Sequence, residues 1–541
     1  MSQPPSREEH PGTNQFDAQG RAADGCRGSS WPAINVNMGN MTFSIPKLNL
    51  RWPFSRKKDD GPRAKPFQEV FKLYKREYHD IWAGILFLLT LAGFIFLSSA
   101  VLSRYVQGAD FKGHIVNDSS NTIALDTNVL IIFGSNLTLA ISFSTVYFQI
   151  YLWFPDKLIW ITGILNTSVG LGTGLWSLYK KEWGVGITFL MFGLFALCYF
   201  VSWIPRIPFT TVLLRTTSAV TRSYTPVHLV SLFGAIFAVG FTALVFVTLV
   251  ATYIAFTPEE KRSNPICGDA ECKPIVARAL TTFITFVAYW VTEWMKNTMH
   301  TTTAGVHGSW YFYSNNSNSN SLPRSPIRGA LKRALTYSFG SICFGSLFVA
   351  VVDGLRQLCT ISRREEMIGG RNSIGMIANR AVGGFMSGLR YITQTFNRYA
   401  FCHVALYGKP YLQASKYIWQ LMEYRGIDTL VNDSIVGASI SMGAVFVGYI
   451  CGFLAYAQLN FMQPDFNVDG KFTPAFMAYA FLSGFQICKV CMTPVSSGVD
   501  TTFMAMGMEP EVLVTHHPEL WESLLVVYPR VQNTIHPTIH P

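Results

Sequence analysis

The chain contains repeated blocks of twenty or more mostly apolar residues, and this feature limits its possible folds more than any other. A helix rises 1.5 Å per residue, so about 20 apolar residues are needed to cross the hydrocarbon core of a bilayer. Only 14% of the 541 residues are charged, whereas 49% are hydrophobic. So few charges cannot coat a water-soluble body of this size. The sequence therefore predicts an all-α polytopic membrane protein.

The apolar blocks predict a helical bundle of about ten transmembrane helices, eight of which are clearly apolar. The other two, at 334–358 and within 373–406, are more polar and border a segment, 359–398, that contains six Arg and no Lys. If both cross the bilayer, part of this segment lies outside. If both are amphipathic or re-entrant, the segment stays cytoplasmic and eight spans remain. The eight apolar spans are 81–103, 129–153, 158–178, 183–204, 227–256, 275–299, 434–459 and 475–493.

The distribution of Lys and Arg predicts the orientation of the bundle. Residues 51–80 carry nine of these side chains, whereas the following loop at 104–128 carries two. Because cytoplasmic flanks are the richer in Lys and Arg, both termini are expected in the cytoplasm. We predict a disordered cytoplasmic tail at 1–66, a transmembrane domain at 67–510 and a cytoplasmic C-terminal tail at 511–541.

Two features are expected in the outer loops. Asn117 begins the sequence Asn-Asp-Ser, which is an acceptor for N-linked glycosylation. Cys267 and Cys272 share a polar loop on the side of the membrane where a disulfide can persist. We therefore predict a glycan at Asn117 and a disulfide between the two cysteines.

One face of the span at 275–299 is a candidate binding site. Trp290, Glu293, Trp294 and Asn297 are spaced i, i+3, i+4 and i+7, which places them on the same side of a helix. A carboxylate between two indole rings suits an ammonium group, since the rings offer cation–π attraction and the carboxylate supplies the counter-charge. Two other interpretations stay open: the tryptophans belong to the interfacial belt, or Glu293 pairs with a nearby Lys or Arg.

Two other spans contain candidate site residues. Tyr147 and Tyr151 form an aromatic cluster near the end of the span at 129–153, where interfacial residues are equally expected. Asp353 and Arg356 are three residues apart, and an ion pair between them would lower the cost of crossing the bilayer. Such a pair is either structural or part of a gate.

Glycine pairs in two spans predict close helix packing. Gly170 and Gly174 are separated by three residues, as are Gly448 and Gly452. This spacing lets the backbones of two membrane helices approach each other.

Five stretches in the second half of the chain resemble the choline transporter-like family, in particular its fungal branch. They are NTMHTTTAGVHGSWYFY (297–313), RALTYSFGSICFGSLFVAVVDGLRQL (333–358), FNRYAFCHVALYGKPYLQASK (396–416), RGIDTLVNDSIV (425–436) and SSGVDTTFMAM (496–506). Their order also fits the family, and the resemblance covers roughly residues 70–510. It implies a multi-span plasma-membrane protein. Animal members of the family are associated with the uptake of choline and related amines.

The predicted function is the transport of a small polar or cationic solute across the plasma membrane without ATP hydrolysis. The sequence has no phosphate-binding loop and no hydrolase or zinc-protease motif, so no enzyme activity, cofactor or metal is expected. Basic residues lie beside apolar spans, which indicates membrane topology rather than a nucleic-acid partner. The expected partners are the solute and the lipid bilayer. A membrane scaffold or sensor that does not transport is the alternative.

Overall fold

A computed structural model describes most of the helical part of the chain. The described residues are 35–38, 41–44, 77–108, 127–256, 274–313, 325–368, 373–425, 434–463, 470, 473–529 and 531. The predicted glycosylation site at Asn117 and the predicted disulfide between Cys267 and Cys272 lie outside these residues.

The chain divides into two units, Met1–Asp59 and Asp60–Pro541. In the first unit, β1 (Asn35–Met38) and β2 (Met41–Ser44) form an antiparallel hairpin in which Asn35 pairs with Ser44. The sequence predicts a disordered tail at 1–66, and this hairpin is the regular structure described within it.

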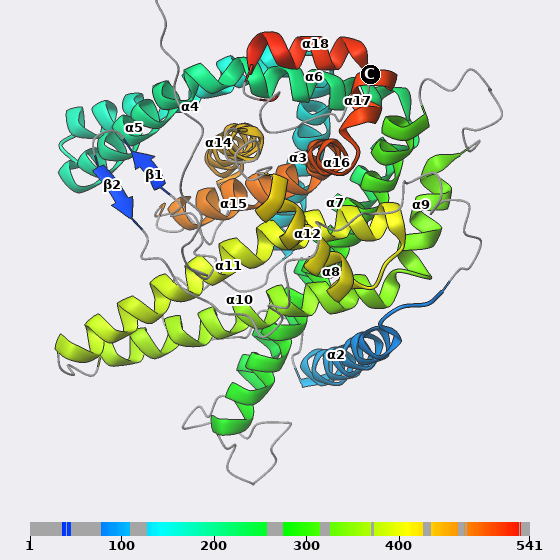
Figure 1. The fold of residues 1–541 in the computed structure, drawn as a ribbon. Helices are drawn as coiled ribbons and strands as arrows, with labels where there is room; N and C mark the ends of the chain where they lie inside the picture. The colour runs from blue at the N-terminus through cyan, green and yellow to red at the C-terminus, as the bar shows by residue number, and fades with distance from the viewer. Residues whose placement is uncertain are drawn as a thin grey trace, which may run out of the picture. The chain divides into compact units, whose positions relative to one another are not determined.

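The second unit is built from α-helices (Figure 1). Several of them begin with proline, whose fixed φ and missing N–H suit the first helical position. The helices are α2 (Ile81–Gly108), α3 (Thr127–Trp153), α4 (Pro155–Tyr179), α5 (Trp183–Trp203), α6 (Ile207–Ser223), α7 (Pro226–Phe256), α8 (Pro274–Tyr313), α9 (Pro326–Leu335), α10 (Phe339–Ile368), α11 (Ser373–Tyr407), α12 (Tyr411–Arg425), α14 (Val436–Met462), α15 (Thr473–Cys491), α16 (Thr493–Met508), α17 (Pro510–His516) and α18 (Pro518–Val527). A short 3₁₀ turn, Ile204–Arg206, joins α5 to α6.

Eight segments of the described residues are long and apolar enough to cross a membrane. They lie in α2, α3, α4, α5 with α6, α7, α10, α14 and α15. Large apolar side chains such as Leu89 on α2 and Phe192 on α5 are exposed on their outer faces. A protein that exposes so much apolar surface on its long helices is suited to lipid rather than water. The prediction of an all-α polytopic membrane protein is therefore confirmed.

The eight segments differ in one member from the eight apolar spans expected from sequence. The apolar part of α10, Phe339–Arg356, is among them, although 334–358 was one of the two more polar candidates. The span expected at 275–299 is not among them. It lies within α8, which has 40 residues but carries Arg278, Glu293 and Lys296 among its apolar side chains. The two long polar helices of the described structure are thus α8 and α11, and they pack against each other.

The helices of the second unit pack as two neighbouring groups (Figure 1). One contains α3, α4, α5, α14 and α15, and the other contains α2, α7, α8, α10 and α11. The helix α16 packs against α8, α11 and α6, and α15 packs against α7, so these contacts join the groups.

The glycine pairs lie at close helix contacts. A Cβ at Gly174 would stand 2.7 Å from the backbone nitrogen of Leu190 on α5, and one at Gly170 would stand 3.1 Å from the Cα of Gly193. On α14, a Cβ at Gly448 would stand 2.9 Å from the carbonyl oxygen of Phe481 on α15. The predicted role of these glycines in helix packing agrees with this geometry.

The C-terminal helices α17 and α18 dock on the bundle through a buried histidine. The Nε2 atom of His517 lies 2.9 Å from the carbonyl oxygen of Tyr311 on α8. Its ring also packs on Trp310, with centroids 4.1 Å apart. Burial lowers the pKa of His517, and the neighbouring His516 acts in the same direction, although the bond to Tyr311 opposes them. The neutral imidazole is therefore the favoured form in the docked state.

We expect the docking of α17 and α18 to weaken in acid. Because the docked-state pKa lies below the ordinary value of 6.5, the contribution of His517 is complete above that value and is lost as pH falls from it through the lowered pKa. Hydrogen exchange over 510–527 at about pH 7.5 and about pH 5.5, corrected for intrinsic rates, should show less protection in acid. A His517→Gln variant should lose this difference. Equal protection of the unmodified protein at both pH values would contradict the expectation.

Candidate functional site

The face predicted on α8 makes contacts of two kinds. The indole N–H of Trp290 donates to the carbonyl oxygen of Cys343 on α10 at 3.0 Å, and the side chain is 1% exposed. The buried Asn297 donates to the hydroxyl of Ser346, also on α10, at 2.9 Å. Both residues therefore join α8 to α10, and their polar groups are used by these bonds.

The other two members of that face are less enclosed. Trp294 is half-buried and packs on Phe87 of α2, with ring centroids 5.1 Å apart. Its indole nitrogen is buried and has no hydrogen-bond partner within the described part of the chain. Glu293 pairs with Lys296 one turn later, at 3.4 Å. Of the alternatives open from sequence, the pairing of Glu293 with a nearby Lys or Arg is therefore observed.

A second ion pair joins α10 to α11. Asp353 is 5% exposed and its Oδ1 atom lies 2.8 Å from Nε of Arg390. The N–H of Arg390 Nε does not point at Asp353 Oδ1 well enough to form a hydrogen bond, so the contact between them is an ion pair without one. Asp353 also interacts electrostatically with Arg356, the partner expected from spacing, and with Glu293 and Lys296 on α8. The nearest cation recorded for Asp353 thus comes from another helix, 37 positions along the chain.

A third ion pair joins α11 to α16. Asp500 is buried and its carboxylate lies 3.8 Å from the guanidinium of Arg398. The backbone around this pair is fixed by buried side chains. His300 Nε2 lies 3.0 Å from the carbonyl oxygen of Arg398 and 3.4 Å from Sγ of Cys402, while Ser497 donates to the carbonyl oxygen of His300 at 2.7 Å. These bonds connect α8, α11 and α16.

Lys489 brings a further cation to the same region from α15. It interacts electrostatically with Lys296, Arg390 and Arg398. Its Nζ atom lies 5.6 Å from the centre of the Phe485 ring, and no carboxylate of the described chain lies within 4.0 Å of it. In the described structure, the exposed Lys489 is therefore close enough to three cations to be repelled by them and has no carboxylate within 4.0 Å.

We call this set of seven ionisable side chains the charged centre. It draws on five helices, α8, α10, α11, α15 and α16, and holds four cations and three carboxylates. Its members are Glu293, Lys296, Asp353, Arg390, Arg398, Lys489 and Asp500. Each of the three carboxylates has one of these cations within 4.0 Å, and Lys489 is the cation of the set that has no such partner in the described structure. No group of three His, Cys, Asp or Glu side chains within the described ranges is arranged to hold a metal ion.

The tyrosines expected to complete the site lie elsewhere. Tyr147 and Tyr151 are buried in the largest hydrophobic cluster, where the hydroxyl of Tyr151 lies 3.3 Å from that of Ser439 on α14. The side chain of Tyr147 packs against Gly443. Trp290 belongs to a different cluster, formed with α2 and α10. The structure therefore does not bring the two predicted aromatic groups together.

Sequence reasoning missed Arg390 and Arg398 as members of the site. Both lie in the segment with six Arg and no Lys, which we use in the sequence analysis only to ask whether the two neighbouring helices cross the bilayer. Arginine in a membrane helix requires a partner or a polar cavity. The same segment was therefore a usable signal for the partners of Asp353 and Asp500.

Comparison with known proteins identifies the family. A family model described as plasma-membrane choline transporter matches residues 187–511. The chain belongs to this family. The matched region contains all seven residues of the charged centre.

Fungal relatives extend the family match over most of the chain. Protein pns1 of Aspergillus fumigatus is 47% identical over 492 residues, which cover 88% of this chain and 91% of the relative. Protein PNS1 of Gibberella zeae is 43% identical over 87% of this chain and 86% of its own length. Protein PNS1 of Neurospora crassa is 42% identical over 87% and 84%. The resemblance to the fungal branch is confirmed.

Proposed function

We propose that the protein moves a small polar or cationic solute, such as a choline-like amine, across the plasma membrane without ATP hydrolysis. The observation that carries this proposal is the charged centre. Its three carboxylates are largely buried between helices, its four cations are partly or fully exposed beside them, and the other long helices of the described structure are apolar. Charges at such positions are costly and mark solute or ion paths in membrane proteins. Membership of the choline transporter family supports the same function.

In this proposal, Glu293 and Trp294 bind the cationic group of the solute. Lys296 lies 3.4 Å from Glu293 and its side chain is 44% exposed, so it can move away while the solute takes its place. Trp294 follows Glu293 on α8 and would offer its aromatic ring to the same cationic group. Trp290 and Asn297 hold α8 against α10 and thereby position the two contact residues. The pair of Asp353 and Arg390 acts as a gate between α10 and α11.

An uptake assay in cells tests the proposed solute class. Cells with and without the gene are supplied with labelled amines, and the gene should increase the uptake of at least one quaternary or primary amine. Glu293→Gln should reduce that uptake about tenfold or more, because it removes the counter-charge. A Glu519→Gln variant, on the exposed side of α18, should leave uptake unchanged. Equal uptake by the Glu293→Gln variant would exclude Glu293 as the binding residue while leaving transport itself possible.

A zwitterionic solute is a second candidate, and Lys489 favours it. This lysine lies among three other cations and has no carboxylate nearby in the described structure. A solute with both an ammonium and a carboxylate or phosphate group would bind Glu293 with one end and Lys489 with the other. Lys489→Gln should then reduce uptake of the zwitterion and leave uptake of a simple quaternary amine unchanged. Equal loss for both solutes would contradict this second candidate.

The rival function is a membrane scaffold or sensor. Its working parts would be the basic N-terminal tail and the inner Asn- and Ser-rich loop. Deleting residues 1–66 and 314–324 while keeping the helices separates the two functions, since a transporter should keep most of its flux and a scaffold should lose its activity.

A further inference from the structure

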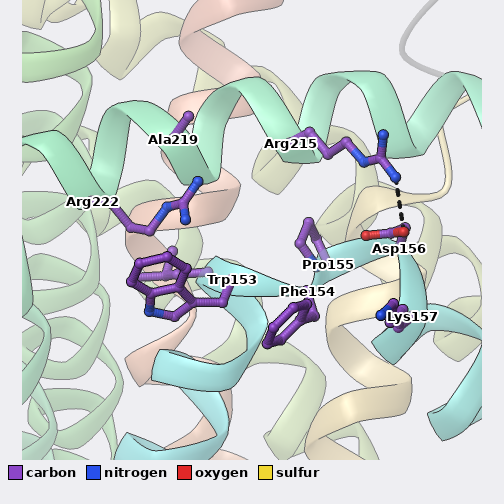
Figure 2. Close-up of a pocket in the computed structure, with 9 residues that line it drawn as sticks. Trp153, Phe154, Pro155, Asp156, Lys157, Arg215, Ala219 and Arg222 are labelled. Atoms are coloured by element: carbon purple, nitrogen blue, oxygen red, sulfur yellow. Dashed lines mark hydrogen bonds and ion pairs between the residues drawn. The ribbon is translucent and has the colours of Figure 1, made fainter.

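A cleft lies where α3 turns into α4 and α6 crosses over the turn (Figure 2). Its volume is about 480 Å³, which falls within the range of small-molecule sites. Trp153 ends α3 and Pro155 begins α4, so a single residue, Phe154, makes the turn. The proline at the first helical position fixes this sharp change of direction. Residues Arg215, Ala219 and Arg222 of α6 form the opposite wall.

The side chains that line the cleft give it excess positive charge. Arg215 pairs with Asp156 at 2.8 Å. Arg222 lies over the ring of Trp153, 4.5 Å from its centre, and Lys157 lies 5.2 Å from the centre of the Phe154 ring. Neither Arg222 nor Lys157 has a carboxylate within 4.0 Å in the described structure. Among the residues that line the cleft, three cations therefore accompany one carboxylate, and the contacts recorded for Arg222 and Lys157 are with aromatic rings (Figure 2).

The surroundings of the cleft are those of a membrane interface. Trp153 is 62% exposed and Phe154 is 48% exposed. Along α4, Trp160 and Ile161 are also exposed, so an apolar surface runs from the cleft toward the middle of the span. Aromatic rings of this kind lie at the level of lipid headgroups. The Lys and Arg distribution predicts that this end of the bundle faces the cytoplasm, where the leaflet is rich in anionic lipids.

We propose that the cleft binds the phosphate-bearing headgroup of an anionic lipid from the inner leaflet. Arg222 and Lys157 contact the phosphate, while Arg215 stays paired with Asp156 and adds long-range attraction. Trp153 and Phe154 pack beside the glycerol region, and the acyl chains follow the apolar surface of α4. This site is separate from the charged centre and does not depend on the proposed transport. A soluble phosphate would use the cations but would gain nothing from the exposed aromatic and apolar surface.

The test measures lipid retained by the full-length protein. Native mass spectrometry of protein purified in detergent counts phosphatidylserine and phosphatidylcholine bound over a range of lipid concentrations. The unmodified protein should retain phosphatidylserine preferentially. A Lys157→Gln, Arg222→Gln double variant should need about 25-fold more phosphatidylserine for equal occupancy, which is about fivefold for each lost cation. Asp156→Asn should act in the opposite direction and increase affinity, because it removes the competing carboxylate.

A matched control lies at the other end of the same helix. Lys180 lies over the ring of Trp176 at 5.4 Å, which reproduces the cation–π geometry of Lys157 outside the cleft. Lys180→Gln should therefore leave phosphatidylserine retention unchanged. Equal loss in this control and in the double variant would overturn the proposal, as would equal retention of both lipids. Displacement of the lipid by millimolar inorganic phosphate would identify a free phosphate as the ligand and would overturn the assignment to a lipid.

Discussion

The Asp353→Asn variant is expected to lose transport and to unfold more readily than the unmodified protein. The carboxylate is 5% exposed and lies 2.8 Å from Arg390, so its loss leaves a guanidinium inside the bundle without its counter-charge. Breaking a fully buried pair costs about 3–5 kcal/mol. Because Arg390 is 35% exposed, we expect about 2–3 kcal/mol here. If the pair is a gate, flux should fall at least tenfold.

Two further variants separate the role of the Asp353–Arg390 pair in folding from its role in transport. The Asp353→Asn, Arg390→Gln double variant removes both charges and should recover most of the lost stability, giving a coupling energy of about 1–3 kcal/mol. Its flux should remain low, because the gate stays absent. Asp156→Asn breaks an exposed pair with the same 2.8 Å separation and should cost less than about 1 kcal/mol. Full stability of Asp353→Asn, or equal losses in Asp353→Asn and Asp156→Asn, would contradict the account of the charged centre.

Replacing Gly174 by Ala is expected to cost about 1–3 kcal/mol of folding free energy. The new Cβ would stand 2.7 Å from the backbone nitrogen and 3.0 Å from the Cα of Leu190, so α4 and α5 must move apart. Neither contact is with a flexible side chain that could turn away. The loss of stability is measured by heating the purified protein in detergent and following the decrease of its monodisperse peak in size-exclusion chromatography.

The control for this variant is two residues away on the same helix. A Cβ at Gly172 would meet no atom within 4 Å. Gly172→Ala should therefore be neutral or stabilising by up to about 1 kcal/mol, because alanine favours the helix. Equal behaviour of the two variants would show that the close contact between α4 and α5 does not limit stability.

Most of the helical architecture could be predicted from the sequence. An apolar segment long enough to cross the bilayer forms a helix, because a helix satisfies its backbone hydrogen bonds within the segment. The bounds of α3, α4 and α14 therefore lie close to those expected. The sequence predicts an apolar span at 275–299, but this segment is part of α8, which also carries many polar side chains and is not among the apolar spans of the described structure. Trp290, Asn297 and His300 of α8 find their partners on α10, α11 and α16, and hydropathy along the chain does not reveal such contacts.

The charged centre was only partly predictable. Spacing along one helix is fixed by its geometry, so the placement of Glu293 beside Trp294 followed from the sequence. Pairing between helices depends on how they pack, and spacing alone gave Asp353 a partner at i+3 rather than Arg390. The same reason explains why Trp290 bonds to α10, whereas Tyr147 lies in another cluster.

Flux through the purified protein tests the central claim most directly. The full-length chain is reconstituted into liposomes without ATP, and the entry of labelled choline is compared with that into empty liposomes and into liposomes that contain Asp353→Asn. We expect saturable entry that is well above the empty liposomes and at least tenfold above the variant. Entry no faster than into empty liposomes, from a folded preparation and for zwitterionic amines as well as choline, would contradict the proposal that the charged centre is a solute path.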